Sequence, residues 1–465
     1  MRIPMNISKP TAFFWACFVF TLIHTTAPVV AAERPNIVII FTDDQQYDTY
    51  GANGRSEIQT PALDQLAERG VRFTNAHAAL SLCSPSRAAV LTGRYGSANG
   101  VQKLGAKLGP GEVSFAQDLK RSGYTTLFSG KWHVRNTPNE LGFDRVCSFK
   151  GNGSYFGRRV DDEGRGLNPE EHIDLYCARK SVEMIKDAAE QNKPFVLFHC
   201  TQLPHMKGSS WPAAKKFNDL YSVKDMPLPA NWNDSLKGKP DYLKEVRNRL
   251  RAKQYGYGKP ENIRKHAKDY YAVISEMDSF LELVLKSLKE NGVEDNTYVI
   301  YMSDNGWMLG DHGMTSKVLP FTASTRVPLV IAGPGIEQGV CDTPALNLDL
   351  TATLYDIAGA EPTAKLHGRS LLPLVKGEDP KRTIIHECLG GFGGNDPFLA
   401  AINGRWLYIQ TLSESDHNKV TFEELYDKNK DPAEMTNLVT SKENQTVLKS
   451  LKAEIEQHRT NVLER

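Results

Sequence analysis

The sequence predicts an α/β fold in which a large, mostly parallel sheet is sandwiched by helices and followed by a smaller C-terminal antiparallel sheet plus helix. Up to about residue 380, short apolar runs alternate with amphipathic helical stretches, which is typical of a parallel sheet covered on both faces. Beyond that point come the strand-like pieces "TIIHECL", "FLAAI" and "WLYIQTL", and a final helix is expected from about Lys442 to Leu463. We therefore expect a main α/β domain over residues 33–380 and a subdomain over residues 381–465.

The first 32 residues differ from the rest and are interpreted as a signal peptide. Arg2 and Lys9 precede the apolar run "TAFFWACFVFTLI", and "APVVAA" offers small residues suited to cleavage after Ala32. A membrane span is the alternative, but the apolar run is short for a bilayer and "HTT" interrupts it. The expected product is an exported protein without stable membrane insertion, periplasmic or secreted, or lysosomal if its source is eukaryotic.

The charge balance argues against a nucleic-acid partner. The 465 residues include 56 Lys and Arg against 55 Asp and Glu, and the basic residues are scattered rather than gathered into a stripe. Cysteine usage gives no sign of a zinc or redox motif, because the 7 cysteines form no C-x-x-C pair. Cys17 lies in the signal peptide, and most of the others are interpreted as packing residues, with one or two disulfide bridges left open.

Four apolar runs end in polar, charged or imidazole residues. "NIVIIF" leads into Asp43 and Asp44, "YTTLFSG" into Lys131, Trp132 and His133, "PFVLFHC" into "TQLPH" with His205, and "YVIYM" into Asp304 and Asn305. Loops after strands are polar by default, so each case alone has an ordinary explanation. Parallel strands, however, deliver ligand-binding groups at their carboxyl ends, and four such runs in one chain favour a single shared site.

One long helix and one long loop are expected between these runs. The stretch "HAKDYYAVISEMDSFLELVLKSLKE" carries apolar residues at helical spacing and ends before Gly292. We expect its acidic residues and His266 on a solvated face. Residues 207–259 are rich in Lys, Pro, Trp and Asn without clean periodicity, which predicts a long loop insertion that could set substrate choice.

The carboxylates at two of the strand ends imply a cation. Asp43, Asp44 and Asp304 would repel one another strongly if they converged, unless a positive ion neutralised them. Together with Asn305 they offer only oxygen ligands, which hard divalent ions prefer. Adjacent acids in a loop are often merely hydrated, but their position after a buried strand favours a calcium or magnesium site over a zinc site.

Cys83 is predicted to lie at the start of a helix. In "CSPSRAAVLTG", Ser84 fits an N-cap, Pro85 the first helical position and Gly93 the helix end. A thiolate nucleophile would be favoured at a helix start, although a buried cysteine more often has only a structural role. Phosphatase thiolate chemistry does not fit, because it needs a C-x5-R spacing and Arg87 gives C-x3-R.

These motifs resemble those of the type I sulfatases, a family with an alkaline-phosphatase-like fold. "CSPSRAAVLTGR" resembles the family's C-x-P-S-R signature, which is specific because it is also the recognition sequence of the modifying enzyme. "GKWH", "PH" at residues 204–205, "SDNG" and the lysine of "GDHGMTSK" follow in the family's order. "RVPLVIAGPG" and "ELYDKNKDPAEMTNL" are also similar, so the resemblance covers nearly all of the mature chain.

The resemblance implies a sulfuric ester hydrolase that removes sulfate from a sulfated carbohydrate. A formylglycine-generating or sulfatase-maturating enzyme would oxidise Cys83 to Cα-formylglycine, whose hydrate attacks sulfur. Calcium would be held by Asp43, Asp44, residue 83, Asp304 and Asn305. Of the other residues, Arg87 would fix the hydrate, His133 would assist its second hydroxyl, Lys131 and Lys317 would bind sulfate, and His205 would protonate the departing oxygen.

The substrate and two alternative functions stay open. Trp132, Trp307, His312 and the insertion are candidates for sugar contacts, although aromatic residues near strand ends are at least as often part of the core. The sequence departs from the family at "KVLPFTASTRVPLV" and "DDQQYDTYG", near the expected mouth of the site. A phosphomonoester or phosphonate hydrolase on the same scaffold is the alternative enzyme, and a non-catalytic glycan-binding protein is the alternative without chemistry.

Overall fold

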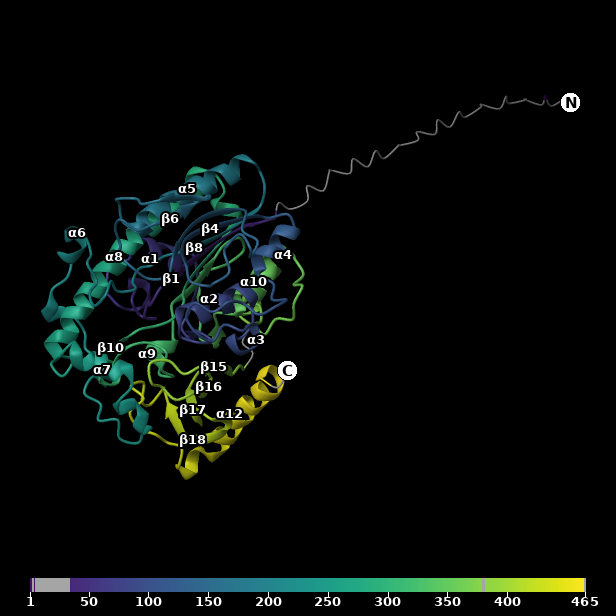
Figure 1. Ribbon diagram of the computed structural model, residues 1–465. Helices are drawn as coiled ribbons and strands as arrows, with labels where there is room; N and C mark the ends of the chain where they lie inside the picture. The colour runs from purple at the N-terminus through teal and green to yellow at the C-terminus, as the bar shows by residue number, and fades with distance from the viewer. Residues whose placement is uncertain (2–3, 5–33, 379–380, 464–465) are drawn as a thin grey trace. The chain divides into compact units, whose positions relative to one another are not determined.

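The computed structural model describes residues 34–378 and 381–463, together with Met1 and Pro4 (Figure 1). Residues Arg34–Arg465 cluster into one compact unit. The predicted signal peptide lies outside the described residues apart from Met1 and Pro4, so it stays a prediction. In the part of the chain that is described, no helix has both the length and the apolar character needed to cross a membrane.

A ten-stranded sheet forms the centre of this unit, in the order β13-β2-β12-β9-β1-β8-β4-β5-β6-β7. The strands are β1 (Asn36–Thr42), β2 (Gly70–Phe73), β4 (Thr125–Trp132), β5 (Arg145–Lys150), β6 (Val160–Asp162), β7 (Arg165–Leu167), β8 (Phe195–Cys200), β9 (Thr297–Ser303), β12 (Leu329–Ala332) and β13 (Gly339–Cys341). The five central strands β9, β1, β8, β4 and β5 are parallel, whereas β12 and β6 join antiparallel. This arrangement confirms the predicted mostly parallel sheet.

Helices cover both faces of the sheet because the central strands are apolar on both sides. Every residue of β1 is buried; Val38 and Ile40 face one cluster of core residues, and Ile37 and Ile39 face another. The first cluster includes residues of α1 (Pro61–Glu68), α5 (Ile173–Glu190) and α8 (Pro260–Glu290), and the second includes residues of α2 (Cys83–Thr92), α4 (Phe115–Arg121) and α10 (Asp349–Ala358). Figure 1 shows α5 and α8 on the opposite side of the central strands from α4 and α10.

Helix α8 begins six residues before the predicted stretch, at Pro260, and ends at Glu290. The prediction that its acidic residues are solvated is wrong for Glu276 and Asp278, which are buried. Asp278 accepts hydrogen bonds at 2.9 Å from the backbone N–H groups of Ala62 and of Leu63, two of the otherwise unpaired donors at the start of α1. The buried Asp278 carboxylate is stabilised because it caps the start of the neighbouring helix α1.

The insertion over residues 207–259 is mostly loop, as predicted, but it contains short helices. These are α6 (Lys215–Asn218), η2 (Val223–Asp225), η3 (Asp241–Lys244) and α7 (Arg247–Gln254). The sequence of α7, "RNRLRAKQ", has no apolar stripe, and only Asn248 and Ala252 are buried. Its helical state therefore depends on polar contacts with the rest of the fold rather than on an amphipathic pattern.

The C-terminal part is a four-stranded antiparallel sheet with a helix, as predicted. Strands β15 (Ile384–Cys388), β16 (Phe398–Ile402), β17 (Trp406–Ser413) and β18 (Asp416–Asp427) pair in chain order, and α12 (Gln445–His458) contributes to the same core. Strand β18 was not expected, because much of it is polar and exposed. Whether residues 381–465 are a separate subdomain stays a prediction.

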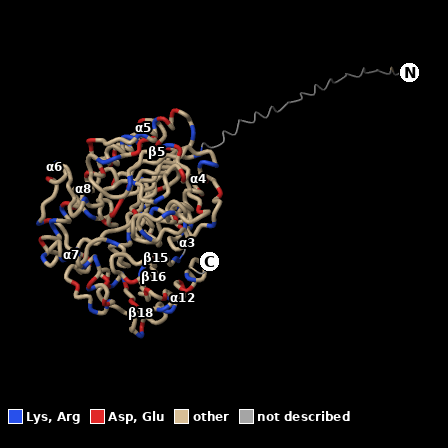
Figure 2. Tube along the Cα trace, in the orientation of Figure 1, with Lys and Arg blue, Asp and Glu red and all other residues tan. Residues whose placement is uncertain are grey.

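Short elements complete the described chain. They are η1 (Gly51–Asn53), β3 (Ala76–His77), α3 (Gly96–Asn99), η4 (Glu294–Asn296), β10 (Met308–Leu309), η5 (Asp311–Gly313), β11 (Thr315–Ser316), α9 (Thr322–Thr325), β14 (Ala345–Leu346), α11 (Leu372–Val375), η6 (Lys442–Asn444) and η7 (Arg459–Leu463). Lys and Arg are interspersed with Asp and Glu along the whole trace in Figure 2. The six cysteines of the described residues are all buried, as expected of packing residues.

Candidate active site

The carboxyl ends of β1 and β9 place the predicted oxygen ligands next to one another. The backbone N–H of Asp304 donates to the carbonyl of Thr42 at 2.9 Å, and the backbone N–H of Asp44 donates to Asp304 Oδ1 at 3.2 Å. Asn305 Nδ2 donates to Asp44 Oδ1 at 2.6 Å. Asp44 has a φ of 66°, in the left-handed region that a short polar side chain tolerates better than most residues.

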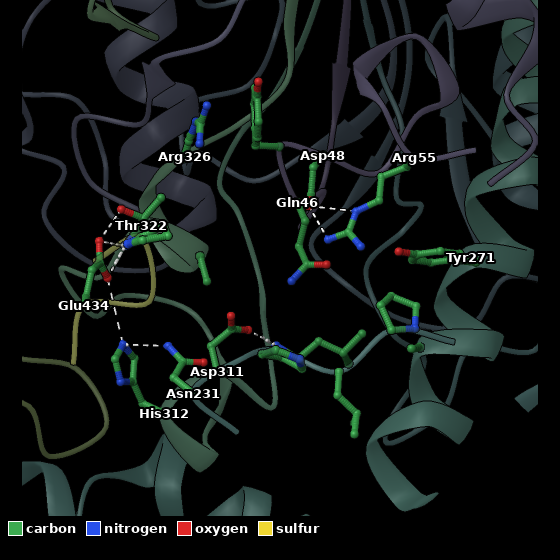
Figure 3. Close-up of a pocket in the computed structure, with 18 residues that line it drawn as sticks. Gln46, Asp48, Arg55, Asn231, Tyr271, Asp311, His312, Thr322, Arg326 and Glu434 are labelled. Carbon is green, nitrogen blue, oxygen red and sulfur yellow. Dashed lines mark hydrogen bonds and ion pairs between the residues drawn. The ribbon is translucent and has the colours of Figure 1, made fainter. Parts of the chain in front are cut away.

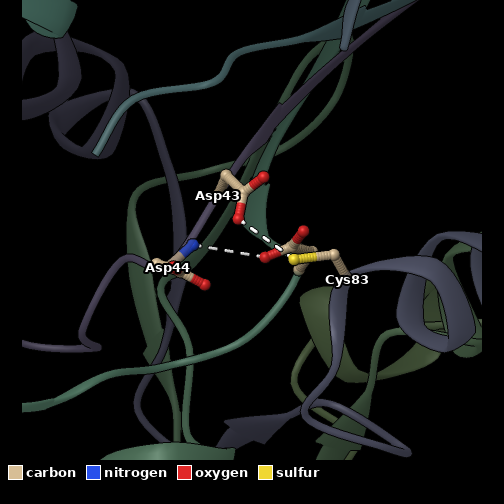
Figure 4. Close-up of side chains that lie close together, drawn as sticks. Asp43, Asp44 and Cys83 are labelled. Atoms are coloured by element: carbon tan, nitrogen blue, oxygen red, sulfur yellow. Dashed lines mark hydrogen bonds between the residues drawn. The ribbon is translucent and has the colours of Figure 1, made fainter. Parts of the chain in front are cut away.

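Cys83 joins this group from the start of α2. One ligand atom from each of Asp43, Asp44, Cys83 and Asp304 lies within 4.8 Å of the others, and all four residues are buried. The sulfur of Cys83 points toward Asp43 in Figure 4, with Sγ 3.4 Å from Oδ1. The chain therefore brings a cysteine into a cluster of carboxylates that are far from it in sequence.

The predicted start of α2 is wrong by two residues. Cys83, not Pro85, is the first helical residue, and Leu82 is the N-cap. The Ser84 hydroxyl makes no cap; it donates instead to the carbonyl of His133, which ties α2 to the end of β4. The helix ends at Gly93, with a φ of 65°, as predicted.

The unmodified Cys83 side chain is a neutral thiol. Burial raises its pKa to about 12, although the Lys317 ammonium beside it acts in the opposite direction. Burial therefore disfavours the thiolate alternative for the unmodified side chain.

Three cations surround the carboxylates. Arg87 donates from Nε at 3.1 Å and from Nη2 at 2.9 Å to Asp304 Oδ2, and it is almost completely buried. The Lys131 ammonium contacts Asp43, and the Lys317 ammonium contacts Asp44 and lies 2.7 Å from Cys83 Sγ. Since both lysine side chains are buried, these charges would bind an anion in a site that largely excludes water.

The donor set fits a hard divalent cation. Asp44 Oδ2 and Asn305 Oδ1 are buried and have no hydrogen-bond partner among the described residues. Each therefore has an oxygen lone pair free for a ligand. With three carboxylates within reach of one another, the chemistry is that of a calcium or magnesium site.

Two histidines reach the same region. His205 Nδ1 lies 2.8 Å from the carbonyl of Met206, so this nitrogen carries the hydrogen, and Nε2 faces Asp44 Oδ2 at 3.6 Å. His133 Nδ1 is buried and has no hydrogen-bond partner among the described residues. Each imidazole thus has one nitrogen available for proton transfer with a bound substrate.

Above the cluster lies a cavity of about 320 Å³. Its lining residues come from several separate segments of the chain and include Cys83, Asn152, His205, Met206, Arg247, Arg251, Trp307, Lys317 and Phe392. Asn152 and Phe392 are not predicted from the sequence, and Arg247 and Arg251 belong to the predicted 207–259 insertion without being singled out within it. They lie in loops or in the apolar-poor helix α7, where no periodicity or motif marks them.

Of the three single residues predicted as sugar contacts, only Trp307 lines this cavity, whereas the 207–259 insertion, also a candidate, contributes Gly208, Arg247 and Arg251 to it. Trp132 is buried, packs edge-on against Phe128 at 4.8 Å between ring centroids, and donates through its indole N–H to the carbonyl of Asn136. His312 lines a second cavity, of about 230 Å³, where Asp234 Oδ2 lies 2.7 Å from its Nδ1. Figure 3 shows His312 with Asn231 and Glu434 around this second cavity, which does not contain Cys83.

Comparisons with solved structures agree with this architecture. A structure of a protein in complex with its substrate D-glucosamine-2-N,6-O-disulfate matches with a TM-score of 0.81 and 23% identity, over 93% of this chain and 100% of that one. The phosphonate monoester hydrolase of Agrobacterium radiobacter matches with a TM-score of 0.71 and 22% identity, over 90% of this chain and 96% of that one. At these identities the likeness shows the shared fold.

Curated relatives include two bacterial sulfatases. The N-acetylglucosamine-6-O-sulfatase of Bacteroides thetaiotaomicron is 26% identical over 74% of this chain and 72% of its own length. The choline-sulfatase of Rhizobium meliloti is 27% identical over 87% of this chain and 82% of its own. The sulfatase family model matches residues 35–360, which contain every element of the cluster described above. The chain therefore belongs to the sulfatase family.

Proposed function

We propose that this sulfatase removes sulfate from a sulfated carbohydrate, and that Cys83 acts after its conversion to Cα-formylglycine. The observation that carries the proposal is the position of Cys83 at the first residue of α2, within a carboxylate cluster and 2.7 Å from the Lys317 ammonium. A buried thiol in this position is a poor nucleophile, whereas a hydrated aldehyde carries two hydroxyls. Each of these hydroxyls would take part in one step of the reaction.

The two hydroxyls divide the reaction. One attacks sulfur, the bond between sulfur and the sugar oxygen breaks, and the sugar leaves as an alcohol after taking up a proton. The second hydroxyl then loses its proton, the C=O bond re-forms, and the bond to the sulfate oxygen breaks. Sulfate and the aldehyde result, and water restores the hydrate. No second attack on the intermediate by external water is required, which distinguishes this route from ordinary nucleophilic catalysis.

The residues around position 83 suit these steps. Arg87, one turn further along α2, would hold the hydrate, and Lys131 and Lys317 would bind the sulfate oxygens as charge develops in the transition state. His133, whose Nδ1 is unpartnered, would accept the proton of the second hydroxyl. His205, when its imidazole is protonated on both nitrogens, would give the Nε2 proton to the sugar oxygen, since Nδ1 is engaged by the carbonyl of Met206.

Asp43, Asp44, Asp304 and Asn305 would hold calcium together with residue 83. Bound calcium would neutralise the carboxylates and favour the ionised form of the attacking hydroxyl. Without calcium, Lys131 and Lys317 would stay paired with Asp43 and Asp44 instead of being available to the sulfate anion.

The choice of a carbohydrate follows from the cavity and from the relatives. The lining of the cavity combines the aromatic rings of Trp307 and Phe392 with polar and cationic side chains. Such a lining suits a sulfated sugar, whose C–H groups can pack on aromatic rings while its charged groups contact cations. The relative from Bacteroides thetaiotaomicron is named for an amino-sugar sulfate. We further propose export to the periplasm or the cell exterior, with a formylglycine-generating or sulfatase-maturating enzyme as a partner during biogenesis.

Sulfate esters should be hydrolysed much faster than phosphate esters. The cluster offers one cation site among the described residues, with two lysines beside it, and this charge suits a sulfate monoanion better than a phosphate dianion. The measurement is kcat/KM for nitrophenyl sulfate and nitrophenyl phosphate, followed by sulfate release from a panel of defined sulfated saccharides. A preference for the phosphate ester would favour the alternative phosphoester or phosphonate hydrolase, and no turnover of any ester would favour the glycan-binding alternative.

His205→Ala should lose at least about a hundredfold in kcat/KM on a sugar sulfate and far less on nitrophenyl sulfate. General acid assistance contributes on this order when the leaving group is a basic alkoxide, whereas nitrophenolate leaves without a proton. If His205 only supports the shape of the site, the two substrates should lose activity in parallel. The ratio of the two losses therefore separates the acid role from a packing role.

A further inference from the structure

We propose that arginine side chains of helix α7 bind a second anionic group on the substrate. The preferred substrate would then carry another sulfate or a carboxylate besides the sulfate that is removed. The proposal rests on the proposed sulfatase function and concerns the same cavity. Two arginines of α7, Arg247 and Arg251, line that cavity together with Cys83 and Lys317. Nothing in the reaction itself needs them.

The two arginines lie at the rim of the cavity rather than at its floor. Lys317 is 6% exposed, whereas Arg251 is half-buried and Arg247 is exposed. The scissile sulfate would lie at the floor, against residue 83 and the buried lysines. A group that contacts Arg247 or Arg251 therefore belongs to another part of the same ligand.

The charges of the two arginines are not neutralised by the protein. Neither forms an ion pair with a carboxylate among the described residues, and no Asp or Glu lines the cavity. Arg247 lies over the Phe392 ring at 5.5 Å from its centroid, and Arg251 lies over the Tyr255 ring at 5.7 Å. Arg251 Nη2 also donates to the carbonyl of Gly208 at 3.4 Å, which leaves the other N–H groups of both guanidinium groups available to an anion.

The sequence of α7 places both cations on one face. Residues four positions apart lie on the same side of a helix, about 6 Å apart along its axis. The helix "RNRLRAKQ" contains four cations and no acid. Like charges at this spacing disfavour the helix, and an anion bound between them would remove that cost.

Helix α7 is fixed relative to the catalytic lysine. Asn248 Nδ2 donates to the carbonyl of Lys317 at 2.9 Å, and Arg249 Nη1 donates to the carbonyl of His312 at 2.8 Å. The backbone N–H of Arg247 donates to the carbonyl of Gly393 at 2.8 Å. The rim arginines are thus held at a set distance from the group that binds the scissile sulfate, which is what discrimination between substrates requires.

The test compares matched ligands on protein that cannot turn them over. Cys83→Ala protein in calcium buffer is titrated by calorimetry with N-acetylglucosamine 6-O-sulfate and with glucosamine-2-N,6-O-disulfate. A second pair is a sulfated disaccharide containing a uronate and the same disaccharide with that carboxylate reduced to an alcohol. The same titrations are repeated with Arg247→Gln/Arg251→Gln and, as a control, with Lys253→Gln. Lys253 is an exposed cation of α7 that does not line the cavity.

In at least one pair, the doubly anionic member should bind about tenfold tighter, and the double substitution should reduce this gap to less than about twofold. Lys253→Gln should leave the gap intact, and circular dichroism should show that both variants fold. The proposal is overturned if the members of both pairs bind equally, if the gap survives the double substitution, or if neither doubly anionic ligand binds. Failure of the sulfatase function itself would appear separately, as no sulfate release by protein with a mature residue 83.

Discussion

Replacing Cys83 with alanine should abolish hydrolysis of every sulfate ester, with a loss on the order of ten-thousandfold or more. No other side chain in the cluster can supply the two hydroxyls of a hydrated aldehyde, so the variant loses the nucleophile and the group that later expels sulfate. The fold should persist, because alanine is a good helix former and Cys83 is a small side chain at the first position of α2.

The measurement is kcat/KM on the preferred substrate, together with circular dichroism and the unfolding temperature. Cys147→Ala is the matched control, since Cys147 is equally buried but lies in β5, outside the cavity. Mass spectrometry of wild-type protein from its native host should show the aldehyde or its hydrate at residue 83. Retention of a tenth of the activity by the alanine variant would contradict the formylglycine mechanism.

Removal of calcium should reduce activity to about one hundredth or less, and adding calcium back should restore it. Without calcium, the Lys131 and Lys317 ammonium groups remain paired with Asp43 and Asp44 and are less available to bind the sulfate group. Calcium should also raise the unfolding temperature, because it binds the folded state alone; saturation at 100 times its Kd corresponds to about 2.7 kcal/mol.

The stabilisation gives a readout that does not depend on turnover. Asp304→Asn keeps the shape of the side chain but removes its charge, so calcium should no longer raise the unfolding temperature of this variant. Asp416→Asn, at an exposed position of β18, should respond to calcium like the wild type. Full activity in protein shown to be free of metal would mean that the carboxylates have another purpose.

The centre of the site was predictable because it depends on strand ends and on one specific motif. Asp43, Asp44, Asp304 and Asn305 follow apolar runs that form adjacent parallel strands, and the geometry of such strands brings these residues together. Cys83 was recognisable from "CSPSR" alone. Both features are marked by a local sequence pattern, an apolar run ending in polar residues or a specific motif, and the pairing of parallel strands then brings the marked residues together.

The rim of the site was not predictable in the same way. Trp132 was expected near the substrate, but β4 continues through Lys131 and Trp132, and successive side chains of a strand point to opposite faces. Lys131 reaches Asp43, so Trp132 points into the core. His312 is likewise held away from the cavity, by a hydrogen bond to Asp234 from the insertion.

The helix α7 illustrates why the individual residues at the rim of the cavity could not be predicted from the sequence. Its residues give no apolar period, and its place is set by hydrogen bonds from Asn248 and Arg249 to backbone carbonyls more than sixty residues away. Such contacts exist only after the whole chain has folded. The loop containing Phe392 reaches the cavity from the C-terminal sheet in the same manner.

The burial of Cys83 has a consequence for the order of events in the life of the protein. The side chain is only 1% exposed, at the junction of α2 with the ends of β1 and β9. If Cys83 is oxidised as proposed, the modifying enzyme would need access to a side chain that the folded domain buries at its centre. On this proposal, oxidation would precede folding, and a molecule that folded with an unmodified Cys83 would stay inactive. The fraction of active protein would then depend on the rate of modification relative to the rate of folding, rather than on the stability of the folded enzyme.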